Sequence, residues 1–476
     1  MTLITKYIIV CAYFLLVMGI SFAISKIFKN NEISRNIVHI CAGLGWIFYK
    51  VLFPATIHPI IISSGCVLLT LITSKFKIRF IERESGSFGT VFFTSSMLVM
   101  SLLGYKNQLL FNIFGIAIIC LSCGDAMANI IGKRYGTRTI YMKKSIQGTF
   151  ACFGASVLAM FVLEYLFGIG LNFVDICLLA ILCAITELFA GDYDNIAIPA
   201  VLYMTAYIIF IKEDTAHFYI SLAVGLFMFG FAMRLKLLNI AASFMLFFLV
   251  FILYYFGGVK SFSFLMLMFS VLIVIEKVLK RRTSDIFESV NKEHGVRNER
   301  QLLANCLVAV ITVVIYGITK EVMYLVAFSV AIGETIGDSV ASDVGVLSKK
   351  EPIDICSFRR VPRGVSGGVS LIGTAVSFGV CVYAAVIYAF IYVFDLYSLL
   401  VIAFSSFAGI ILDSILGAKI QAQYQCIICA KITEKECHCQ KETKLIKGNK
   451  ILDNTRVNMV CNVFSAGLAC LLMAIR

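Results

Sequence analysis

Charged residues are scarce in this sequence: Asp, Glu, Lys and Arg make up 14% of its 476 residues, while hydrophobic residues make up 60%. A single soluble core of this size cannot take up so many apolar side chains, so a soluble globular protein is excluded. The mean hydropathy of +0.92 agrees with this conclusion. Apolar runs such as 7–28, 148–167 and 457–475 have the roughly 20 residues that a membrane-spanning helix needs.

Three further features are missing. The first apolar run, 7–28, lacks the basic start and small-residue cleavage site of a signal peptide, so we expect a retained helix. The net charge is +13, but the basic residues lie in short loops between apolar runs and form no basic soluble module. We therefore expect no nucleic-acid partner. Neither a Walker-type Gly-rich loop nor a nucleophile with a matched base is visible.

The apolar runs number about sixteen by the length criterion. They predict an all-α polytopic integral membrane protein with about sixteen transmembrane helices in two related halves. Basic residues concentrate in alternate loops, and every arginine except Arg476 falls in these loops. By the positive-inside rule the basic loops face the cytosol, and both termini face outward.

An internal repeat supports the two halves. Gly124-Asp125-Ala126-Met127-Ala128 begins a nine-residue segment that ends at Gly132, and the segment from Gly337 to Gly345 has the same spacing of Gly, Asp, Ala and Gly. We place the domains at 1–235 and 236–476, with no flexible linker between them. A Cys-rich cytosolic insertion is expected at 421–450.

The two motif segments have similar surroundings. Each ends an apolar helix and is followed by a basic loop and then by a segment rich in Gly, Ser or Thr, at 143–149 in the first half and 363–368 in the second. Both halves later return to Asp-Asn, at 194–195 and 453–454. Several polar elements on one membrane face are what an active site built from helix ends requires.

Aspartates at the mouth of a membrane helix are costly unless they are paired, hydrated or bound to metal. Glu334 precedes Asp338 by one helical turn, so the two carboxylates share a face and can hold Mg²⁺ together. Close packing of small residues explains the glycines by themselves, and a transport path is an alternative for the carboxylates. The expected magnesium ligands are Asp125, Asp194, Glu334, Asp338, Asp343 and Asp453.

Backbone N–H groups at a helix start bind phosphate oxygens, and the basic loops add Lys144 and Arg363 as catalytic cations beside Asp125 and Asp338. Taken singly, such loop cations also set topology or contact anionic lipid. Arg35 and His39 share one helix face at the start of the second apolar run. The expected substrate and nucleotide contacts are Arg35, His39, Gly124, Gly148, Thr149, Asn195, Arg300, Asn305, Gly364, Gly367, Gly368 and Asn454.

Seventeen cysteines occur, and most lie inside apolar runs, where a thiol behaves as a small hydrophobic group. The exception is Cys426-x-x-Cys429 followed by Cys437 and Cys439. These four thiols suit a tetrahedral structural Zn²⁺, and reduced, unbound thiols are the alternative.

The first half, about 30–235, resembles the membrane lipid-alcohol kinases that include dolichol kinase, phytol kinase and CTP-dependent diacylglycerol kinase. The resemblance rests on the segments 34–39, 124–128 with 144–149, and 194–199. The second half, about 237–476, resembles the membrane family that contains phytyl-phosphate kinase. The segments that carry this second resemblance are 297–305, 341–345, 361–369 and 452–454.

Together, the two resemblances imply a bifunctional membrane isoprenoid kinase. The first half phosphorylates an isoprenoid alcohol, the second half converts the monophosphate to the diphosphate, and CTP with Mg²⁺ is the expected donor. Membrane lipid, the isoprenoid substrates and nucleotide are then the partners. The expected location is a bacterial plasma membrane, with the sites on the cytosolic face. A transporter of an anionic lipid or metabolite, and a phosphatidate cytidylyltransferase-like enzyme, are the alternatives.

Overall fold

The computed structural model describes residues 1–28, 31–76, 88–142, 144–212, 214–236, 238–282, 299–345, 348, 350–362, 366–429, 432–434 and 436–476. These residues form mainly long helices joined by short connections, in agreement with the all-α prediction. A few short strands lie in the connections.

Twelve helical segments of the described residues are long and apolar enough to cross a membrane, so the expected number of about sixteen is not confirmed. Two of the twelve are longer than one crossing needs. The segment Phe173–Ile211 has 39 residues and contains a 3-10 turn at Gly191–Tyr193. The segment Ile240–Ile275 has 36 residues and bends at Gly258, whose φ of 64° suits glycine. The first break contains Asp192, and the second lies two residues before Lys260, so each long segment can be read from the sequence as two apolar runs.

The chain folds as two compact units, Met1–Asp214 and Thr215–Arg476. This division falls 21 residues before the boundary that we expected at 235/236. The difference concerns one helix, α9 (Thr215–Leu235), which packs closely on α10 (Ile240–Arg282). A Cβ on Gly225 of α9 would lie 2.7 Å from the carbonyl oxygen of Phe247 in α10, so glycine permits this approach.

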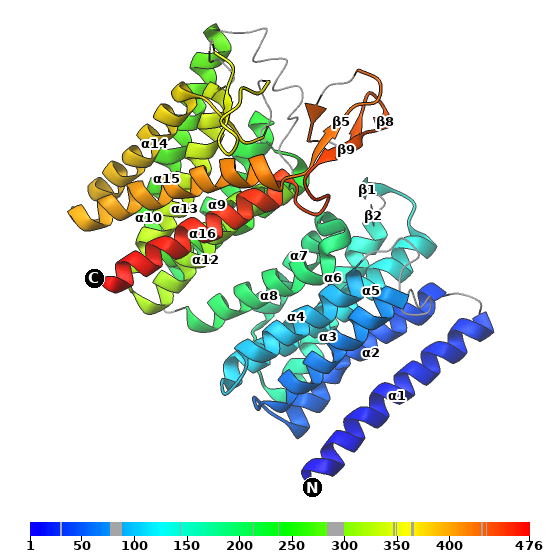
Figure 1. Ribbon diagram of the computed structural model, residues 1–476. Coiled ribbons are helices and arrows are strands. Elements are labelled where there is room, and N and C mark those ends of the chain that lie inside the picture. Colours follow the sequence, from blue (N-terminus) through cyan, green and yellow to red (C-terminus); the bar gives the residue numbers. More distant parts are fainter. Residues whose placement is uncertain are drawn as a thin grey trace. The chain divides into compact units, whose positions relative to one another are not determined.

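In the first unit the described residues form eight α-helices, which Figure 1 labels α1 to α8. They are α1 (Leu3–Phe28), α2 (Asn31–Leu52), α3 (His58–Phe76), α4 (Gly89–Leu103), α5 (Gln108–Tyr135), α6 (Ile146–Phe167), α7 (Phe173–Ala190) and α8 (Asp194–Ile211). The short antiparallel strands β1 (Thr139–Tyr141) and β2 (Lys144–Ser145) connect α5 to α6.

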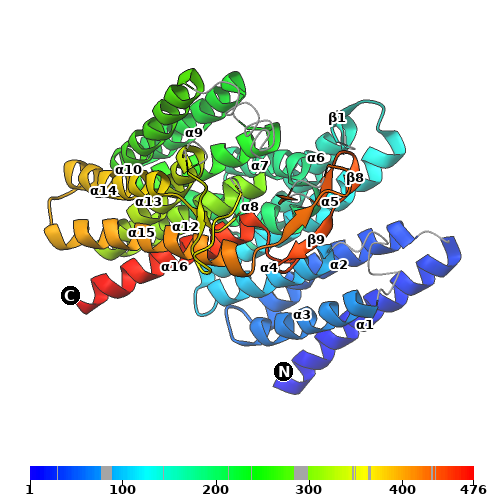
Figure 2. The ribbon, with the colours of Figure 1, turned by 45° about the horizontal axis from the view of Figure 1, so that its top comes forward.

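Helix α5 is the centre of the first unit. It packs against α2, α4, α6, α7 and α8 (Figure 1, Figure 2). In its apolar window 78% of the residues are buried, compared with 17% in α1 and 28% in α6. The first Gly-Asp motif lies on this helix. An aspartate there is surrounded by other helices rather than by lipid.

In the second unit the described part of the chain contains α9, α10 and five further helices. These are α12 (Glu299–Thr319), α13 (Val322–Gly345), α14 (Leu371–Ile391), α15 (Leu396–Lys419) and α16 (Asn454–Ile475). Helix α13 carries the second Gly-Asp motif and packs against α10, α12, α14, α15 and α16. With 72% of its apolar window buried, it takes the central place that α5 has in the first unit.

Short strands accompany the loops of the second unit. Strands β3 (Ile353–Asp354) and β4 (Gly368–Val369) pair antiparallel ahead of α14. The insertion between α15 and α16 forms a three-stranded sheet of order β6-β5-β9 and a hairpin of β7 and β8 (Figure 1). The strands are β5 (Gln423–Gln425), β6 (Ile432–Thr433), β7 (Cys437–His438), β8 (Lys441–Glu442) and β9 (Lys444–Lys447).

Candidate functional site

The repeated Gly-Asp motifs lie on α5 and α13, which we call the Gly-Asp helices. The next helix after each of them, α6 or α14, has a serine as its N-cap residue. In the first unit the Ser145 hydroxyl accepts a hydrogen bond from the backbone N–H of Gly148, at 3.2 Å, as α6 begins. In the second unit the Ser370 hydroxyl accepts from Gly373, at 3.1 Å, as α14 begins. The other N–H groups in the first turn of each helix have no acceptor within the helix itself.

Glycines bring these helix starts close to the Gly-Asp helices. A Cβ on Gly148 would lie 2.9 Å from the carbonyl oxygen of Ala128, and a Cβ on Gly373 would lie 2.9 Å from that of Ala341. Ala128 and Ala341 are the alanines at matching places in the two motifs. The two units therefore share a serine-capped helix start held against the last turns of the motif helix.

This geometry changes the alignment that we expected between the halves. The counterpart of 145–149 (Ser-Ile-Gln-Gly-Thr) is 370–374 (Ser-Leu-Ile-Gly-Thr), and the Gly-rich segment 363–368, which we expected to match it, precedes it in the sequence. Gly367 instead forms a turn with a φ of 84°, next to Ala418. Gly368 lies in β4 and pairs with Asp354 of β3. The predicted residues Arg363 and Gly364, and Lys143 in the first half, lie outside the described residues.

A buried ion pair closes one side of the first site. The Lys144 ammonium donates to the carboxylate of Glu187 in α7, which is 1% exposed. Burial alone would lower the pKa of Lys144, but the carboxylates of Glu187 and Asp125 raise it by more. Lys144 is therefore a fixed positive charge next to the helix start of α6.

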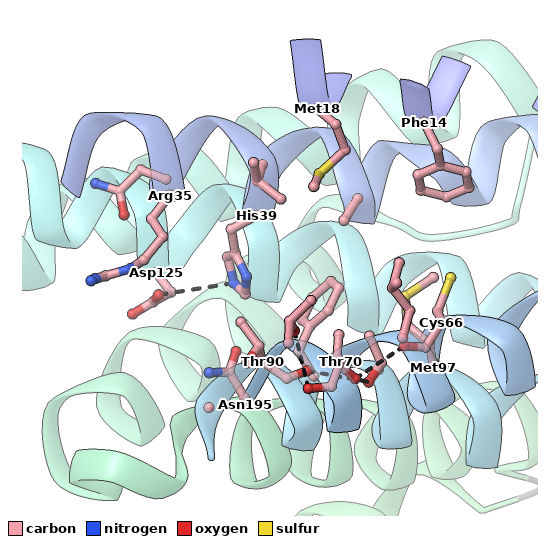
Figure 3. A pocket seen from close by; sticks show the side chains of 18 residues that line it. Phe14, Met18, Arg35, His39, Cys66, Thr70, Thr90, Met97, Asp125 and Asn195 are labelled. Atoms are coloured by element: carbon pink, nitrogen blue, oxygen red, sulfur yellow. Dashed lines mark hydrogen bonds and ion pairs between the residues drawn. The ribbon is translucent and has the colours of Figure 1, made fainter. Parts of the chain in front are cut away.

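A cavity of about 170 Å³ opens beside Asp125 in the first unit. Figure 3 shows Arg35, His39, Asp125 and Asn195 toward one end of it. The opposite end is lined by apolar or weakly polar side chains, among them Phe14, Met18, Cys66, Leu69 and Met97. The cavity thus has a polar end and an apolar body, a shape that suits an amphiphile with a small polar head.

The polar end joins residues from three helices, α2, α5 and α8. The His39 Nε2 atom of α2 lies 3.9 Å from an Asp125 carboxylate oxygen of α5, and Asn129 donates to the other oxygen at 3.1 Å. Asp194 and Asn195 begin α8, and both are buried. The Oδ1 atom of Asn195 has no hydrogen-bond partner in the described part of the chain, although it is buried. A buried amide oxygen of this kind calls for a further partner, such as an ordered water, a ligand or an ion.

The other residues predicted in the first half divide into two groups. Arg35 is half-buried and lines the cavity, and the Thr149 hydroxyl donates to the carbonyl of Ser145 in the first turn of α6. Gly124, by contrast, faces away from open space, because a Cβ there would lie 2.9 Å from Ser156 Oγ. The structure gives Gly124 the helix-packing role that small residues often have in membranes.

The second unit collects carboxylates on α13 and α15. Glu334 is 3% exposed and accepts a hydrogen bond from the Asn462 amide of α16, at 2.7 Å. Asp338, one turn along, and Asp413 of α15 lie near enough to interact electrostatically with each other and with Glu334. Asp343 also interacts with Asp338. We call Glu334, Asp338 and Asp413 the acidic cluster.

The remaining predicted residues of the second half have varied surroundings. Asp453 and Asn454 are exposed, and Asp453 caps α16 by accepting from the N–H of Arg456, so we leave it out of the ion site. Asn305 lies beside the acidic cluster, because its carbonyl accepts from Thr335. Arg300 is exposed in the first turn of α12.

The second unit has no equivalent of the buried ion pair at the matching positions. Val369 precedes the Ser370 cap as Lys144 precedes Ser145. Ile410 lies as far from the Asp395 cap of α15 as Glu187 lies from the Asn172 cap of α7. Both members of the pair are thus apolar in the second unit.

The cysteine insertion gathers three of the four predicted thiols. Cys426, Cys429 and Cys439 have their sulfur atoms near the imidazole of His438, and Cys437 is not part of this group. Adjacent strand residues point to opposite faces, so Cys437 faces away from the side that His438 occupies.

Three functional candidates escaped the sequence prediction. Asp413 stands alone among apolar residues of α15, a signal that we applied to Asp125 and could have applied here. Asn462 of α16 lacks a charge, and Glu434 lies in an insertion whose position no local pattern predicts. Only the packing of α13, α15 and α16 brings these residues to one place.

Comparison with known proteins points to one family. The model of the family described as integral membrane protein DUF92 matches residues 223–466, which covers helices α10 to α15 and parts of α9 and α16. "Protein PGR" of Arabidopsis thaliana is 31% identical over 244 residues, which is 45% of this chain and 81% of that protein.

A second relative is an enzyme. Dolichol kinase sec59 of Schizosaccharomyces pombe is 35% identical over 92 residues, 19% of this chain and 18% of the kinase. The chain thus spans less than a fifth of that kinase. No solved structure matches.

Proposed function

The chain belongs to the integral membrane protein family DUF92, and we propose that it is a lipid-kinase-like membrane enzyme. In this proposal the first unit phosphorylates an isoprenoid alcohol, and the second unit phosphorylates the resulting monophosphate, both with CTP. The short similarity to a dolichol kinase supports the chemical class. Two serine-capped helix starts, one near the buried Asp125 and one near the half-buried Asp338, support two reaction sites.

The observation that carries the proposal is the cavity of the first unit. Its apolar body has room for part of an isoprenoid chain, and a hydroxyl bound at its polar end would lie near Asp125 and His39. The start of α6 and the Lys144 ammonium lie on the other side of the same motif, around Ala128 and Gly132. An acceptor hydroxyl and a phosphate-binding helix start therefore flank one aspartate.

The donor atoms at this place suit Mg²⁺. Mg²⁺ prefers carboxylate and amide oxygens in octahedral geometry, and the first unit offers Asp125, Asp194 and the unsatisfied Oδ1 of Asn195. In the second unit the acidic cluster offers carboxylates. When bound, Mg²⁺ would neutralise phosphate charge and orient the nucleotide.

The chain's own residues then have separate tasks in the first reaction. The acceptor hydroxyl gives its proton to His39 or Asp125 as its oxygen forms a bond to the terminal phosphorus of CTP. The bond from that phosphorus to the bridging oxygen breaks, and CDP leaves with the electron pair. Lys144 and the N–H groups at the start of α6 stabilise the negative charge of the transferred group.

The second unit has more carboxylates at its site than the first unit, as a substrate that already carries a phosphate would require. Its substrate already carries a phosphate, so the site must hold more negative charge than the first. The acidic cluster offers more carboxylates for divalent cations, which can offset the two sets of phosphates. Val369 and Ile410 replace the ion pair, so the cations rather than a lysine would supply the positive charge there.

Product analysis tests the proposal directly. Purified protein in detergent is given phytol, farnesol or geranylgeraniol with labelled CTP and Mg²⁺, and we expect labelled monophosphate followed by diphosphate. Absence of both products with every alcohol and nucleotide would overturn the proposal. Release of pyrophosphate from CTP with phosphatidate would identify a cytidylyltransferase. Uptake of an anionic lipid into liposomes without nucleotide turnover would identify a transporter.

A further inference from the structure

The insertion between α15 and α16 brings four metal-ligating atoms together. The sulfur atoms of Cys426, Cys429 and Cys439 and a ring nitrogen of His438 all lie within 4.8 Å of one another. The His438 Nδ1 atom is 3.5 Å from Cys429 Sγ and 3.3 Å from Cys439 Sγ, and the sulfurs of Cys429 and Cys439 are 3.9 Å apart.

These distances match a tetrahedral zinc site. With Zn–S bonds of about 2.3 Å, two sulfur ligands of one zinc ion lie about 3.8 Å apart. A disulfide would need the sulfurs at about 2.05 Å, so these cysteines are free thiols, and the space between them suits one shared ion. Three thiolates and one imidazole are a ligand set that structural zinc sites use.

The backbone around the ligands is shaped for this arrangement. The N–H of Ile428 points at Cys426 Sγ, at 3.4 Å, in the turn that follows β5. In the hairpin of β7 and β8, Cys439 and Gln440 both have positive φ, at 51° and 61°. Two successive non-glycine residues in this conformation are strained, and such strain persists where the surroundings stabilise it. A bound ion that holds Cys439 supplies that stabilisation.

The insertion also reaches the second reaction site. Glu434, between β6 and β7, accepts hydrogen bonds from Ser366 at 2.5 Å and from Gln421 at 2.9 Å. Glu434 interacts electrostatically with Asp338 and Asp413. Since Cys429 precedes Glu434 and His438 follows it, an ion bound by both would fix the ends of the segment that carries this carboxylate.

We propose that Cys426, Cys429, His438 Nδ1 and Cys439 bind one Zn²⁺, which holds Glu434 beside the acidic cluster. Cys437 is not a ligand in this assignment. Zn²⁺ has a structural task here, because all four positions are filled by protein and none is left for substrate. The positioning of Glu434 rests on the proposed function, whereas zinc binding stands without it.

The metal content of the purified chain tests the site. Full-length protein carrying a tag without histidine is expressed with zinc in the medium and measured by elemental analysis. We expect about one Zn²⁺ per chain. Cys429→Ser and Cys439→Ser should lose it, while Cys437→Ser and Cys356→Ser, a cysteine outside the insertion, should keep it. Co²⁺ in place of zinc should give the absorption bands of a thiolate-bound tetrahedral ion.

Wild-type protein without zinc, or Cys429→Ser with unchanged zinc, would overturn the site. If Cys437→Ser loses its zinc while His438→Ala keeps it, then Cys437 rather than His438 is the ligand, and our assignment is wrong. If both phosphorylations are observed, zinc-free Cys429→Ser should keep the first and lose most of the second. An unchanged second reaction in this zinc-free variant would overturn the positioning of Glu434. Because metal content is measured without substrate, a failed kinase assay leaves the zinc result intact.

Discussion

Lys144 and Glu187, 43 residues apart in sequence, form a buried ion pair beside the helix start of α6. Val369 and Ile410 stand at the matching positions of the second unit. The two units therefore share the backbone arrangement of a capped helix start but differ in the charge placed next to it. This difference leads to the first two predictions.

Removing one partner of the pair should destabilise the first unit strongly. Lys144→Met leaves the Glu187 carboxylate buried without its cation, and such a loss costs about 3 kcal/mol or more. Lys144→Val combined with Glu187→Ile, the pair found in the second unit, should recover most of this stability but not the first phosphorylation. Thermal unfolding in detergent and product analysis measure the two effects. A double variant less stable than Lys144→Met would show that the pair is not the source of the loss.

The charge of Lys144 gives a pH prediction. Its pKa is raised above the ordinary value of about 10.4, so the stabilisation is fully present below that value and is lost only as pH rises through the higher folded-state pKa. The difference in melting temperature between the wild type and the double variant Lys144→Val/Glu187→Ile, in which neither group titrates, should stay constant from about pH 7 to about pH 9.5. A difference that shrinks near pH 8 would show that Lys144 is not held as a cation.

The motif aspartates should affect different products. Asp125→Asn keeps the size of the side chain but removes the charge next to His39, so the monophosphate should fall by about 100-fold or more. Asp338→Asn should leave the monophosphate and abolish the diphosphate when either alcohol or monophosphate is supplied. Asp453→Asn, at an exposed cap, is the control and should keep both products. Loss of both products from either motif variant would contradict separate sites.

Gly148 and Gly373, where α6 meets α5 and α14 meets α13, should not accept a larger side chain without loss of stability. Gly148→Ala and Gly373→Ala each place a Cβ 2.9 Å from a backbone carbonyl, and the backbone must shift at a cost of about 1 to 3 kcal/mol. Gly154→Ala in α6 and Gly379→Ala in α14 are matched controls, because the described structure has open space within 4 Å of them. Those controls should be neutral or slightly stabilising in thermal unfolding. Equal effects in both sets would contradict the close approach.

The cavity of the first unit should set the length of alcohol accepted. Met97 lines the cavity and is 2% exposed, so Met97→Trp should fill part of the apolar body. Long alcohols such as geranylgeraniol should then lose activity more than a short alcohol such as geraniol. Relative kcat/KM values over a series of chain lengths measure this effect. Val99→Trp on the exposed side of α4 is the control and should leave the series unchanged.

The sequence determined the membrane class, the helical architecture and the motif aspartates. Apolar runs with few charges leave no other solvent than lipid, and an aspartate in such a run needs a partner wherever it lies. The repeat of Gly, Asp, Ala and Gly also predicted the same local arrangement at Asp125 and Asp338. These features are local or compositional, so they can be read along the chain.

Tertiary structure alone decided which polar residues share a site. Lys144 meets Glu187 through the packing of α6 and α7, and Asp413 and Asn462 join Glu334 through the packing of α13, α15 and α16. The serine caps corrected the alignment of the halves, and the β7–β8 hairpin placed His438 rather than Cys437 beside the thiols. Apolar sequence carries little information on which helices are neighbours, because an apolar side chain can pack equally well against lipid tails or against another helix. The partners of a buried charge are therefore known only once the helices are packed.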